Sequence, residues 1–440
     1  MSYEEKIEKL FARTPSFQQV GAAAYKPGLE TMLKFAGQLG HPQRRLKCIH
    51  IAGINGKGSV SSFLAASLSS GRRRIGLYTS PHLTDFRERI KIVTEDGFEM
   101  IPREAVEEFL DTYDRFIESH RPSFFEITTA MAFWYFAASG VDLAVIECGL
   151  GGRLDSTNII RPLVSIITNI GLEHTAYLGD TLQKIAFEKA GIIKNGVPVV
   201  IGEINEATRP VFESAAAERG CEIVFAPERC KALVAENQPE AKAALTPSSL
   251  HTTLKKMDLP GEYQRQNLDT VAVALEILRT HYGIEADNSR LERAAHITGL
   301  HGRWEKLAGS PDVICDIGHN AHGLKNVFDQ LRELAPQYRH IHIIFGVVSD
   351  KDVDAIAPLM IQPGSNVSYI LTQPSTQRAM MVKQLADALA RHGISGPTTS
   401  TVAEAVTLAR QAATPSDLIF IGGSNFTVSD AYPLFFCPLS

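Results

Sequence analysis

The chain has 440 residues, of which 44% are hydrophobic and 21% charged, and its formal net charge is −5. This length exceeds what one core normally holds, so two or three domains are expected, and the charge gives no basic surface of the kind that binds nucleic acid. No stretch reaches the ~18 uninterrupted apolar residues of a membrane span, so we expect neither a nucleic-acid nor a membrane partner.

The six cysteines are scattered along the chain and form no Cys-x-x-Cys pair. Cys48, Cys148 and Cys315 lie within apolar runs. This placement predicts buried free thiols in a reducing compartment, so we expect a cytoplasmic protein.

Short apolar runs alternate with helical patterns along almost the whole chain. Strands are expected at residues 46–52, 75–79, 142–148, 163–168, 197–201, 222–225, 312–316, 340–346, 367–372 and 417–421. Helices are expected at residues 59–70, 102–119, 125–139, 181–193, 206–218, 264–281, 322–334, 380–392 and 402–412. The alternation predicts an α/β fold with mainly parallel sheets that are covered by helices on both faces.

Two segments interrupt this order. Residues 226–262 are polar and contain proline, and the β-like stretch 251–257 within them predicts an antiparallel edge strand. Near residues 296–303 the helical patterns stop, and a new series of strands and helices begins at Asp312. We therefore expect a large first domain followed by a smaller α/β domain of typical size.

The run from Cys48 to Ser59 predicts a phosphate-binding loop. A buried strand breaks into glycines at positions 53, 56 and 58, and a helical pattern follows at once. Such a turn directs backbone N–H groups at phosphate oxygens, and Lys57 and Ser59 would reach the outer phosphates and Mg²⁺. The match to the usual P-loop is imperfect, because Ile51 replaces its first glycine and Gly58 separates the lysine from the serine.

A second strand ends in Glu147 and runs into a glycine cluster, Gly149 to Gly152. Hard oxygen ligands suit Mg²⁺, and a carboxylate beside a phosphate loop is placed to supply one. A solvated loop carboxylate is the equally weighted alternative.

The strand expected at 163–168 leads to His174. A lone loop histidine is more often structural or solvent-facing than a ligand, and Mg²⁺ prefers oxygen. The residues alone therefore favour the structural interpretation for His174.

Lys189 lies on the apolar stripe of the helix expected at 181–193. A lysine on such a face must extend to solvent or be paired or neutralised. A neutral amine could also react with CO₂ to form a carbamate, which would turn a cation into an anionic oxygen ligand.

A strand end in the second domain carries Asp316, His319 and Asn320 before a helix. This pattern favours a turn that faces a ligand. The alternative is a plain helix start that is capped by Asn320.

Several motifs together resemble the folylpolyglutamate synthase/dihydrofolate synthase family, which belongs to the Mur-type ATP-dependent amide ligases. The motifs span nearly the whole chain: Gly53-Ile-Asn-Gly-Lys-Gly-Ser59, Thr79-Ser-Pro-His-Leu83, Glu88-Arg-Ile90, Gly149-Leu-Gly-Gly-Arg-Leu-Asp-Ser-Thr-Asn158, Glu188-Lys-Ala-Gly191, Asp316 to Asn320 and Gly346-Val-Val-Ser-Asp-Lys351. The resemblance implies a P-loop ATP-binding domain with a mainly parallel sheet at residues 1–298 and a smaller Rossmann-like glutamate-ligase domain at residues 299–440.

The resemblance also implies roles for individual residues. Ser59 and Glu147 would hold one Mg²⁺, and Glu147, His174 and a carbamylated Lys189 would hold a second. ATP would be bound by Asn55, Gly56, Lys57, Gly58, Ser59, Asn267, Arg303 and Asp316. Lys57, Lys189 and His319 would be catalytic, with His319 near the transferred phosphate and the incoming glutamate. The pterin and folate pocket would be lined by Thr79, Ser80, Pro81, His82, Leu83, Phe124, Glu126 and Asp155.

The implied activity joins L-glutamate to dihydropteroate, to the glutamate tail of tetrahydrofolates, or to both. ATP would phosphorylate the acceptor carboxylate, and the glutamate amine would attack the resulting acyl phosphate between two domains that exclude water. The pocket motifs resemble those of bifunctional enzymes, and we expect a monomer.

Two alternatives remain from the sequence. A muramyl-peptide ligase shares the ATP domain, but such enzymes normally carry a UDP-sugar domain before the phosphate loop, and only 52 residues precede Gly53. A non-catalytic P-loop protein would bind nucleotide without amino-acid-dependent ADP formation.

Overall fold

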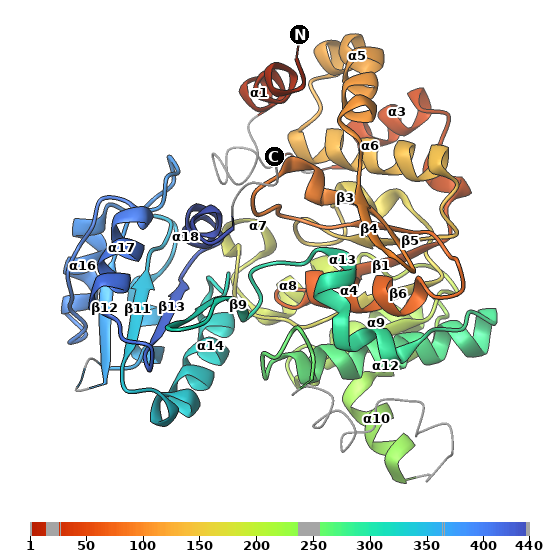
Figure 1. Ribbon diagram of the computed structural model, residues 1–440. Coiled ribbons are helices and arrows are strands. Elements are labelled where there is room, and N and C mark those ends of the chain that lie inside the picture. The colour runs from red at the N-terminus through yellow and green to blue at the C-terminus, as the bar shows by residue number, and fades with distance from the viewer. Residues whose placement is uncertain are drawn as a thin grey trace. The chain divides into compact units, whose positions relative to one another are not determined.

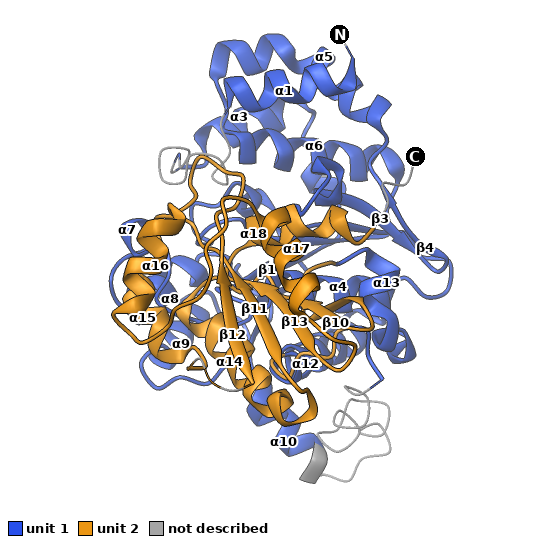
Figure 2. Cartoon of the chain, turned by 60° about the vertical axis from the view of Figure 1, so that its left-hand side comes forward, with its two compact units in different colours: residues 1–258, 264–300 blue, residues 259–263, 301–440 orange. Residues whose placement is uncertain are grey.

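The computed structural model describes residues 2–14, 26, 28–235, 256–362, 364 and 366–436. The chain forms two compact units, shown in different colours in Figure 2. Unit 1 comprises residues 1–258 and 264–300, and unit 2 comprises residues 259–263 and 301–440. The division into functional domains at 298/299 stays a prediction.

Unit 1 is built on an eight-stranded sheet with the order β4-β3-β2-β5-β1-β6-β7-β8. The strands are β1 (Cys48–Ala52), β2 (Ile75–Tyr78), β3 (Ile90–Thr94), β4 (Gly97–Met100), β5 (Leu143–Glu147), β6 (Val164–Ile167), β7 (Val199–Ile201) and β8 (Ile223–Phe225). The pairs from β2 to β8 are parallel, and β3 and β4 form an antiparallel edge. Parallel strands place their carboxyl ends at one edge of the sheet, which is where ligands bind in such folds.

The helices of unit 1 cover its sheet or pack on other helices. They are α1 (Tyr3–Arg13), α3 (Glu30–Gln38), α4 (Lys57–Leu68), α5 (Arg103–His120), α6 (Phe124–Ser139), α7 (Thr175–Leu178), α8 (Leu182–Ala190), α9 (Arg209–Glu218), α10 (Ala226–Ala235), α12 (Gln264–Tyr282) and α13 (Ala294–Thr298). Every residue of β1 and β5 is buried, and both strands are mostly apolar along their length rather than alternating between apolar and polar residues.

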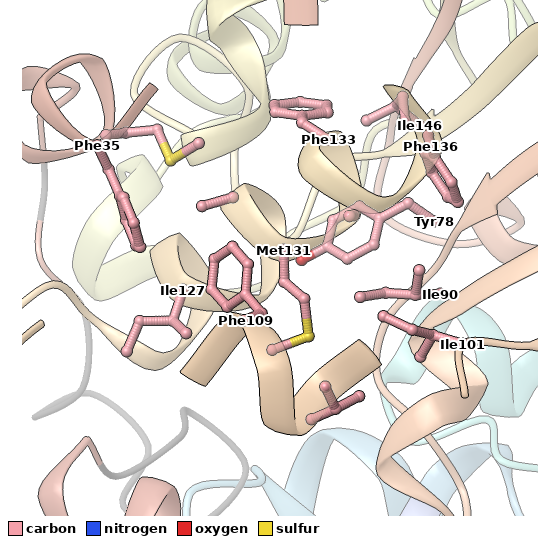
Figure 3. Close-up of a cluster of buried hydrophobic side chains, with 14 of the residues drawn as sticks. Phe35, Tyr78, Ile90, Ile101, Phe109, Ile127, Met131, Phe133, Phe136 and Ile146 are labelled. Atoms are coloured by element: carbon pink, nitrogen blue, oxygen red, sulfur yellow. The ribbon is translucent and has the colours of Figure 1, made fainter. Parts of the chain in front are cut away.

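The main core of unit 1 lies between the sheet and α6. In Figure 3, Ile127 and Met131 of α6 lie close to Phe109 of α5, and Tyr78 at the end of β2 lies beside Met131. Most of α6 is buried, which explains why its sequence is hydrophobic nearly all round instead of on one stripe.

Unit 2 contains a five-stranded sheet with the order β12-β11-β13-β10-β9. Figure 1 shows β12, β11 and β13 side by side. The strands are β9 (Glu305–Ala308), β10 (Asp312–Cys315), β11 (Ile341–Phe345), β12 (Val367–Leu371) and β13 (Leu418–Gly422), and the helices are α14 (Ala321–Leu334), α15 (Val353–Ile356), α16 (Val382–Ala390), α17 (Val402–Ala412) and α18 (Asn425–Ala431). Only the edge strand β9 pairs antiparallel within this sheet.

The α/β fold and the expected strands and helices are confirmed, each to within three residues at its ends. The β3–β4 hairpin, β9 and several helices were not expected. One of these, α10, occupies the start of segment 226–262, where the sequence suggested a break in the helical order. Most of the β-like stretch 251–257 lies outside the described residues.

The buried state of three cysteines is also confirmed, since Cys48, Cys148 and Cys315 are buried free thiols. Within the described part of the chain, none of the helices has the length and apolar character to cross a membrane.

Candidate functional site

The glycine-rich loop follows β1 at the carboxyl edge of the unit 1 sheet. Gly56 caps α4 with a φ of 81°, and Gly53 has a φ of 151°. A Cβ added at Gly56 would collide with the side chain of Asn267, and one at Gly53 would collide with Thr168. The loop therefore requires glycine at both positions, for its backbone conformation and for the close approach of its neighbours.

The end of the neighbouring strand β6 fixes this loop. The Asn169 Oδ1 accepts a hydrogen bond from the backbone N–H of Asn55 at 2.8 Å, and Thr168 Oγ1 donates to the carbonyl oxygen of Asn55 at 2.6 Å. Lys57 and Ser59 then occupy the first turn of α4, where helix N-termini favour anions.

Two lysines from distant parts of the sequence converge on Gly53. Lys57 Nζ donates to the Gly53 carbonyl oxygen at 3.1 Å and to that of Ile54 at 2.9 Å, while Lys189 Nζ donates to the Gly53 carbonyl oxygen at 2.8 Å. Burial and the nearby charge of Lys57 lower the pKa of Lys189 to about 7. The expected inward orientation of Lys189 on α8 is confirmed, because the residue is only 2% exposed.

Ser59 is linked to the start of α12. Gln264 Nε2 donates to Ser59 Oγ at 3.2 Å, and Asn267 Nδ2 donates to Gln264 Oε1 at 2.7 Å. Asn267, which the resemblance placed at ATP, therefore lies beside the phosphate loop, whereas Gln264 was not singled out from the sequence.

Glu147 ends β5, the strand next to β1. Side chains alternate along a strand, and Ala144 and Ile146 face the core beneath α6, so Glu147 projects to the α4 side. Its Oε2 accepts the backbone N–H of Ser80 at 3.2 Å, which joins the ends of β5 and β2. Two buried hard oxygen donors, Glu147 and Ser59, thus lie on the elements that frame the loop, a donor set that fits Mg²⁺.

His174 lies on the loop after β6 and begins α7 with a left-handed φ of 53°. Among the described residues, no cluster of three or more His, Cys, Asp or Glu side chains has the arrangement of a metal site. The predicted set contains two residues of these types, together with Ser59 and a modified lysine. Its convergence on shared ions stays a prediction.

The segment Thr79 to Leu83 meets a cluster of aromatic and cationic side chains. Arg89 Nε donates to His82 Nδ1 at 2.8 Å, and the Arg89 guanidinium lies 5.2 Å from the centre of the Phe124 ring. Phe124 stacks on Phe11 with ring centres 5.1 Å apart. This surrounding suits a flat heterocycle, since aromatic and guanidinium groups both stack on such rings.

Arg89 and Phe11 were not singled out from the sequence. The only available signal was the motif Glu88-Arg-Ile90, which was quoted for its resemblance without a role for Arg89. Arg89 is 3% exposed, although arginine is rarely so buried without partners.

Glu126 and Asp155, both predicted to line the pocket, make local hydrogen bonds. Glu126 completes the capping box of α6 by accepting the Ser123 N–H at 2.7 Å. Asp155 Oδ2 accepts the N–H groups of Gly149 and Leu150, each at 2.8 Å. These contacts give both carboxylates a role in shaping the loops, and their contact with a substrate stays a prediction.

In unit 2, Asp316 directly follows β10 and is 4% exposed. Its carboxylate accepts hydrogen bonds from the Tyr263 hydroxyl at 2.7 Å, the Trp304 N–H at 2.9 Å and the Gly318 N–H at 2.7 Å. Burial raises the pKa of Asp316, and these donors and the charge of Arg303 oppose that effect.

The other predicted site residues of unit 2 lie on the turn before β9 and on the loop after β10. Arg303 Nη1 lies 3.3 Å from the carbonyl oxygens of His301 and Gly302, and His319 Nδ1 lies 3.0 Å from the carbonyl oxygen of Ile317. Asn320 caps α14, as the alternative interpretation of this segment held. The roles of Arg303, Asp316 and His319 toward ATP and glutamate stay predictions.

Comparison with known families gives two matches along the chain. Residues 51–275 match the Mur ligase middle domain, and residues 302–425 match the Mur ligase glutamate ligase domain.

Individual relatives match over nearly the whole chain. A probable bifunctional folylpolyglutamate synthase/dihydropteroate synthase from Haloferax volcanii is 32% identical over 98% of this chain, which spans about half (50%) of that longer protein. The dihydrofolate synthase/folylpolyglutamate synthase of Bacillus subtilis strain 168 is 32% identical over 82% of this chain and 85% of its own.

Among solved structures, the bifunctional folylpolyglutamate synthase/dihydrofolate synthase of Yersinia pestis c092, complexed with AMPPNP and a Mn ion, has a TM-score of 0.74 at 25% identity. The match covers 98% of this chain and 97% of that one. With the phosphate loop and the two matched domains, these similarities show that the chain belongs to the folylpolyglutamate synthase/dihydrofolate synthase family of Mur ligases.

Proposed function

We propose that the protein is an ATP-dependent ligase that adds L-glutamate to dihydropteroate and to the glutamate tail of reduced folates. The observation that carries this proposal is the convergence of Lys57 and Lys189 on the carbonyl of Gly53, within a glycine loop at a strand end. The Lys57 ammonium group and the N-terminal turn of α4 favour a strongly anionic ligand such as ATP, and the buried amine of Lys189 lies at the same backbone oxygen.

The reaction needs activation because a carboxylate is a poor acyl donor. An oxygen of the acceptor carboxylate attacks the γ-phosphorus of ATP, ADP leaves, and an acyl phosphate forms. The amine of glutamate then attacks the acyl carbon, loses a proton and expels phosphate. Lys57 and the first turn of α4 would stabilise the negative charge on the transferred group.

A divalent metal fits the oxygen donors at this site. Ser59 and Glu147 would hold one Mg²⁺, and Glu147, His174 and carbamylated Lys189 a second. Bound Mg²⁺ neutralises phosphate charge and orients the γ-phosphoryl group. The lowered pKa of Lys189 supports the carbamate, because only a neutral amine reacts with CO₂.

The acceptor would bind along Thr79 to Leu83, with its flat ring near His82 and Phe124. Arg89 adds a buried positive charge to this region, which suits an acceptor that carries carboxylates. The relative from Bacillus subtilis is named for both activities, which supports a bifunctional enzyme.

The second part of the chain would supply the remaining groups. We assign residues 1–298 to ATP binding and residues 299–440 to glutamate ligation, with Asn267 and Arg303 at the nucleotide and His319 near the incoming glutamate. The match of residues 302–425 to a glutamate ligase domain supports this division.

We further propose a cytoplasmic monomer. Cys48, Cys148, Cys221, Cys230 and Cys315 are free thiols, which supports a reducing compartment. Light scattering of the purified protein should give the mass of one chain, and the mass of a dimer would contradict this proposal.

The test is an omission experiment with purified protein, ATP and Mg²⁺. ADP release should require both L-glutamate and an acceptor, and should occur with dihydropteroate and with a reduced folate that already carries glutamate. ADP release without glutamate dependence would instead support a nucleotide-hydrolysing or nucleotide-sensing protein. Activity with only one acceptor would restrict the proposal to that half of the reaction.

A further inference from the structure

The turn at residues 301–304 in unit 2 has an unusual backbone. Trp304 has a φ of 51°, a left-handed conformation that bulky residues rarely adopt, and its side chain is buried. Gly302 also has a positive φ, and a Cβ there would meet the Ile317 side chain at 2.6 Å. A conformation of this kind persists only where its surroundings fix it.

Two carboxylates anchor this turn by accepting backbone N–H groups at two of its residues. Glu305 Oε2 accepts the Gly302 N–H at 2.6 Å, and Asp316 Oδ2 accepts the Trp304 N–H at 2.9 Å. Arg303 lies between these two anchored residues, so the anchors determine the direction of its side chain.

Both carboxylate oxygens of Asp316 accept hydrogen bonds in this region. Its Oδ1 accepts the Gly318 N–H, and its Oδ2 accepts both the Trp304 N–H and the Tyr263 hydroxyl. Both carboxylate oxygens are therefore bound by donors of unit 2, and hydrogen bonds to a charged group are among the stronger ones in proteins.

Tyr263 ends a five-residue segment, Leu259–Tyr263, that belongs to unit 2 although unit 1 residues flank it in the sequence. Glu262 N–H also donates to Gln330 Oε1 at 3.1 Å, so the segment is held at two successive residues. Neither the sequence motifs nor the resemblance gave Tyr263 a role.

We propose that Tyr263 is a positioning residue for nucleotide binding, which acts through Asp316 on the turn that carries Arg303. Asp316 is then the buried centre of this turn and affects ATP through Arg303 rather than by direct contact. This inference rests on the proposed function, in which Arg303 contacts ATP.

The chain offers a matched control at the other end of the same strand. The Tyr338 hydroxyl donates to Asp312 Oδ2 at 2.8 Å, and Asp312 begins β10 as Asp316 follows it. Tyr263→Phe and Tyr338→Phe therefore remove the same kind of hydrogen bond from opposite ends of β10. Only the first lies at the end where parallel strands of this sheet present ligand-binding residues.

The experiment measures the dissociation constant of a non-hydrolysable ATP analogue with Mg²⁺ by calorimetry. Tyr263→Phe should weaken binding about tenfold, the loss expected for one hydrogen bond to a charged group. Tyr338→Phe should stay within about twofold of the wild type. Equal affinities of the two phenylalanine variants would overturn the inference.

The route through Arg303 is tested by double variants. Arg303→Ala should weaken binding by itself, and adding Tyr263→Phe or Asp316→Asn to it should change the affinity by no more than about twofold. A further tenfold loss with Asp316→Asn in this background would make Asp316 a direct ligand and contradict the proposal. Normal binding by Arg303→Ala would contradict it as well.

These outcomes are separate from those of the ligase assay. If the wild type released no ADP in response to glutamate, the proposed function would fail whatever the affinities of the variants. If the wild type were an active ligase but Tyr263→Phe bound the analogue normally, only the present inference would fail.

Discussion

The strand-end loops of the two units gather opposite kinds of groups. After β1, two lysine side chains meet at one carbonyl oxygen, that of Gly53, whereas after β10 three donors meet at one carboxylate, that of Asp316. In the first loop the Lys57 ammonium group donates to two carbonyl oxygens, which carry no net charge, so its charge still attracts a polyanion. In the second loop the negative charge of Asp316 is bound by three hydrogen-bond donors of the protein itself. The first arrangement suits chemistry on phosphate, and the second suits control of loop shape.

The largest effect should come from Lys57 in the phosphate loop. Lys57→Ala should lower glutamate-dependent ADP release by at least about 100-fold, because it removes a charge at the site where phosphate charge develops. Lys184→Ala is the matched control and should leave the rate unchanged, since Lys184 lies exposed on α8 and pairs with Asp180 four residues away. A rate within tenfold of wild type for Lys57→Ala would show that the phosphate loop takes no part in the reaction.

His174 should show the next effect. His174→Ala should also lower glutamate-dependent turnover strongly, and the Mg²⁺ concentration needed for half-maximal rate should rise, because one ligand of the second ion is lost. Chelation of divalent metal should abolish turnover of the wild type. His281→Ala, a substitution on the exposed side of α12, serves as the control. An unchanged Mg²⁺ requirement would favour the structural interpretation of His174.

A smaller effect is expected where a carboxylate shapes a loop in unit 1. Thr157 Oγ1 donates to Asp155 and lies 2.8 Å from His50 Nε2, so it links the buried centre of β1 to the glycine cluster. Thr157→Val should raise the KM for the folate acceptor about tenfold and leave the KM for ATP within twofold, since it removes one hydrogen bond to a charged group.

Thr157→Ser should restore the acceptor KM, because it returns the hydroxyl. Thr280→Val, at an exposed site where the hydroxyl bonds only its own helix, should have no effect on either KM. Equal changes in the KM values for ATP and acceptor would contradict a local role for this link.

The smallest effect concerns stability. Burial lowers the pKa of Lys91 to about 8, and its Nζ donates to the carbonyl oxygen of Gly299. Between pH 8 and pH 10.5 the unfolded chain binds a proton at this lysine that the folded chain does not, so folding gains stability as the pH rises.

Lys91→Met removes this titration. The free energy of unfolding of the wild type, relative to that of the variant, should be constant below pH 8 and rise from pH 8 to pH 10. Urea unfolding at four pH values measures the difference. A flat or falling difference above pH 8 would show that Lys91 is not buried as described.

Much of this molecule follows from local sequence patterns. The strands β1, β5 and β11 are largely apolar runs, and the glycine cluster that follows β1 marks the turn into a helix. Both features are readable without a structure. The inward face of Lys189 was also predictable, because helical spacing places it on the apolar stripe of α8.

The remainder depends on contacts between segments far apart in the chain. Gln264 reaches Ser59 across 205 residues, and nothing in the pattern around Gln264 indicates this partner. Tyr263 reaches Asp316 across more than fifty residues, and nothing in its own segment marks it as a partner. Local propensity carries no information on such pairs, so they appear only in the folded chain.

The most direct test of the proposed reaction follows one oxygen atom of the acceptor carboxylate. An acceptor labelled with ¹⁸O in its reacting carboxylate should transfer one labelled oxygen to the inorganic phosphate for each amide formed, because phosphate leaves with the oxygen that attacked ATP. Mass spectrometry of the released phosphate gives the result. Phosphate without the label, at a rate of amide formation that matches ADP release, would contradict the acyl-phosphate route.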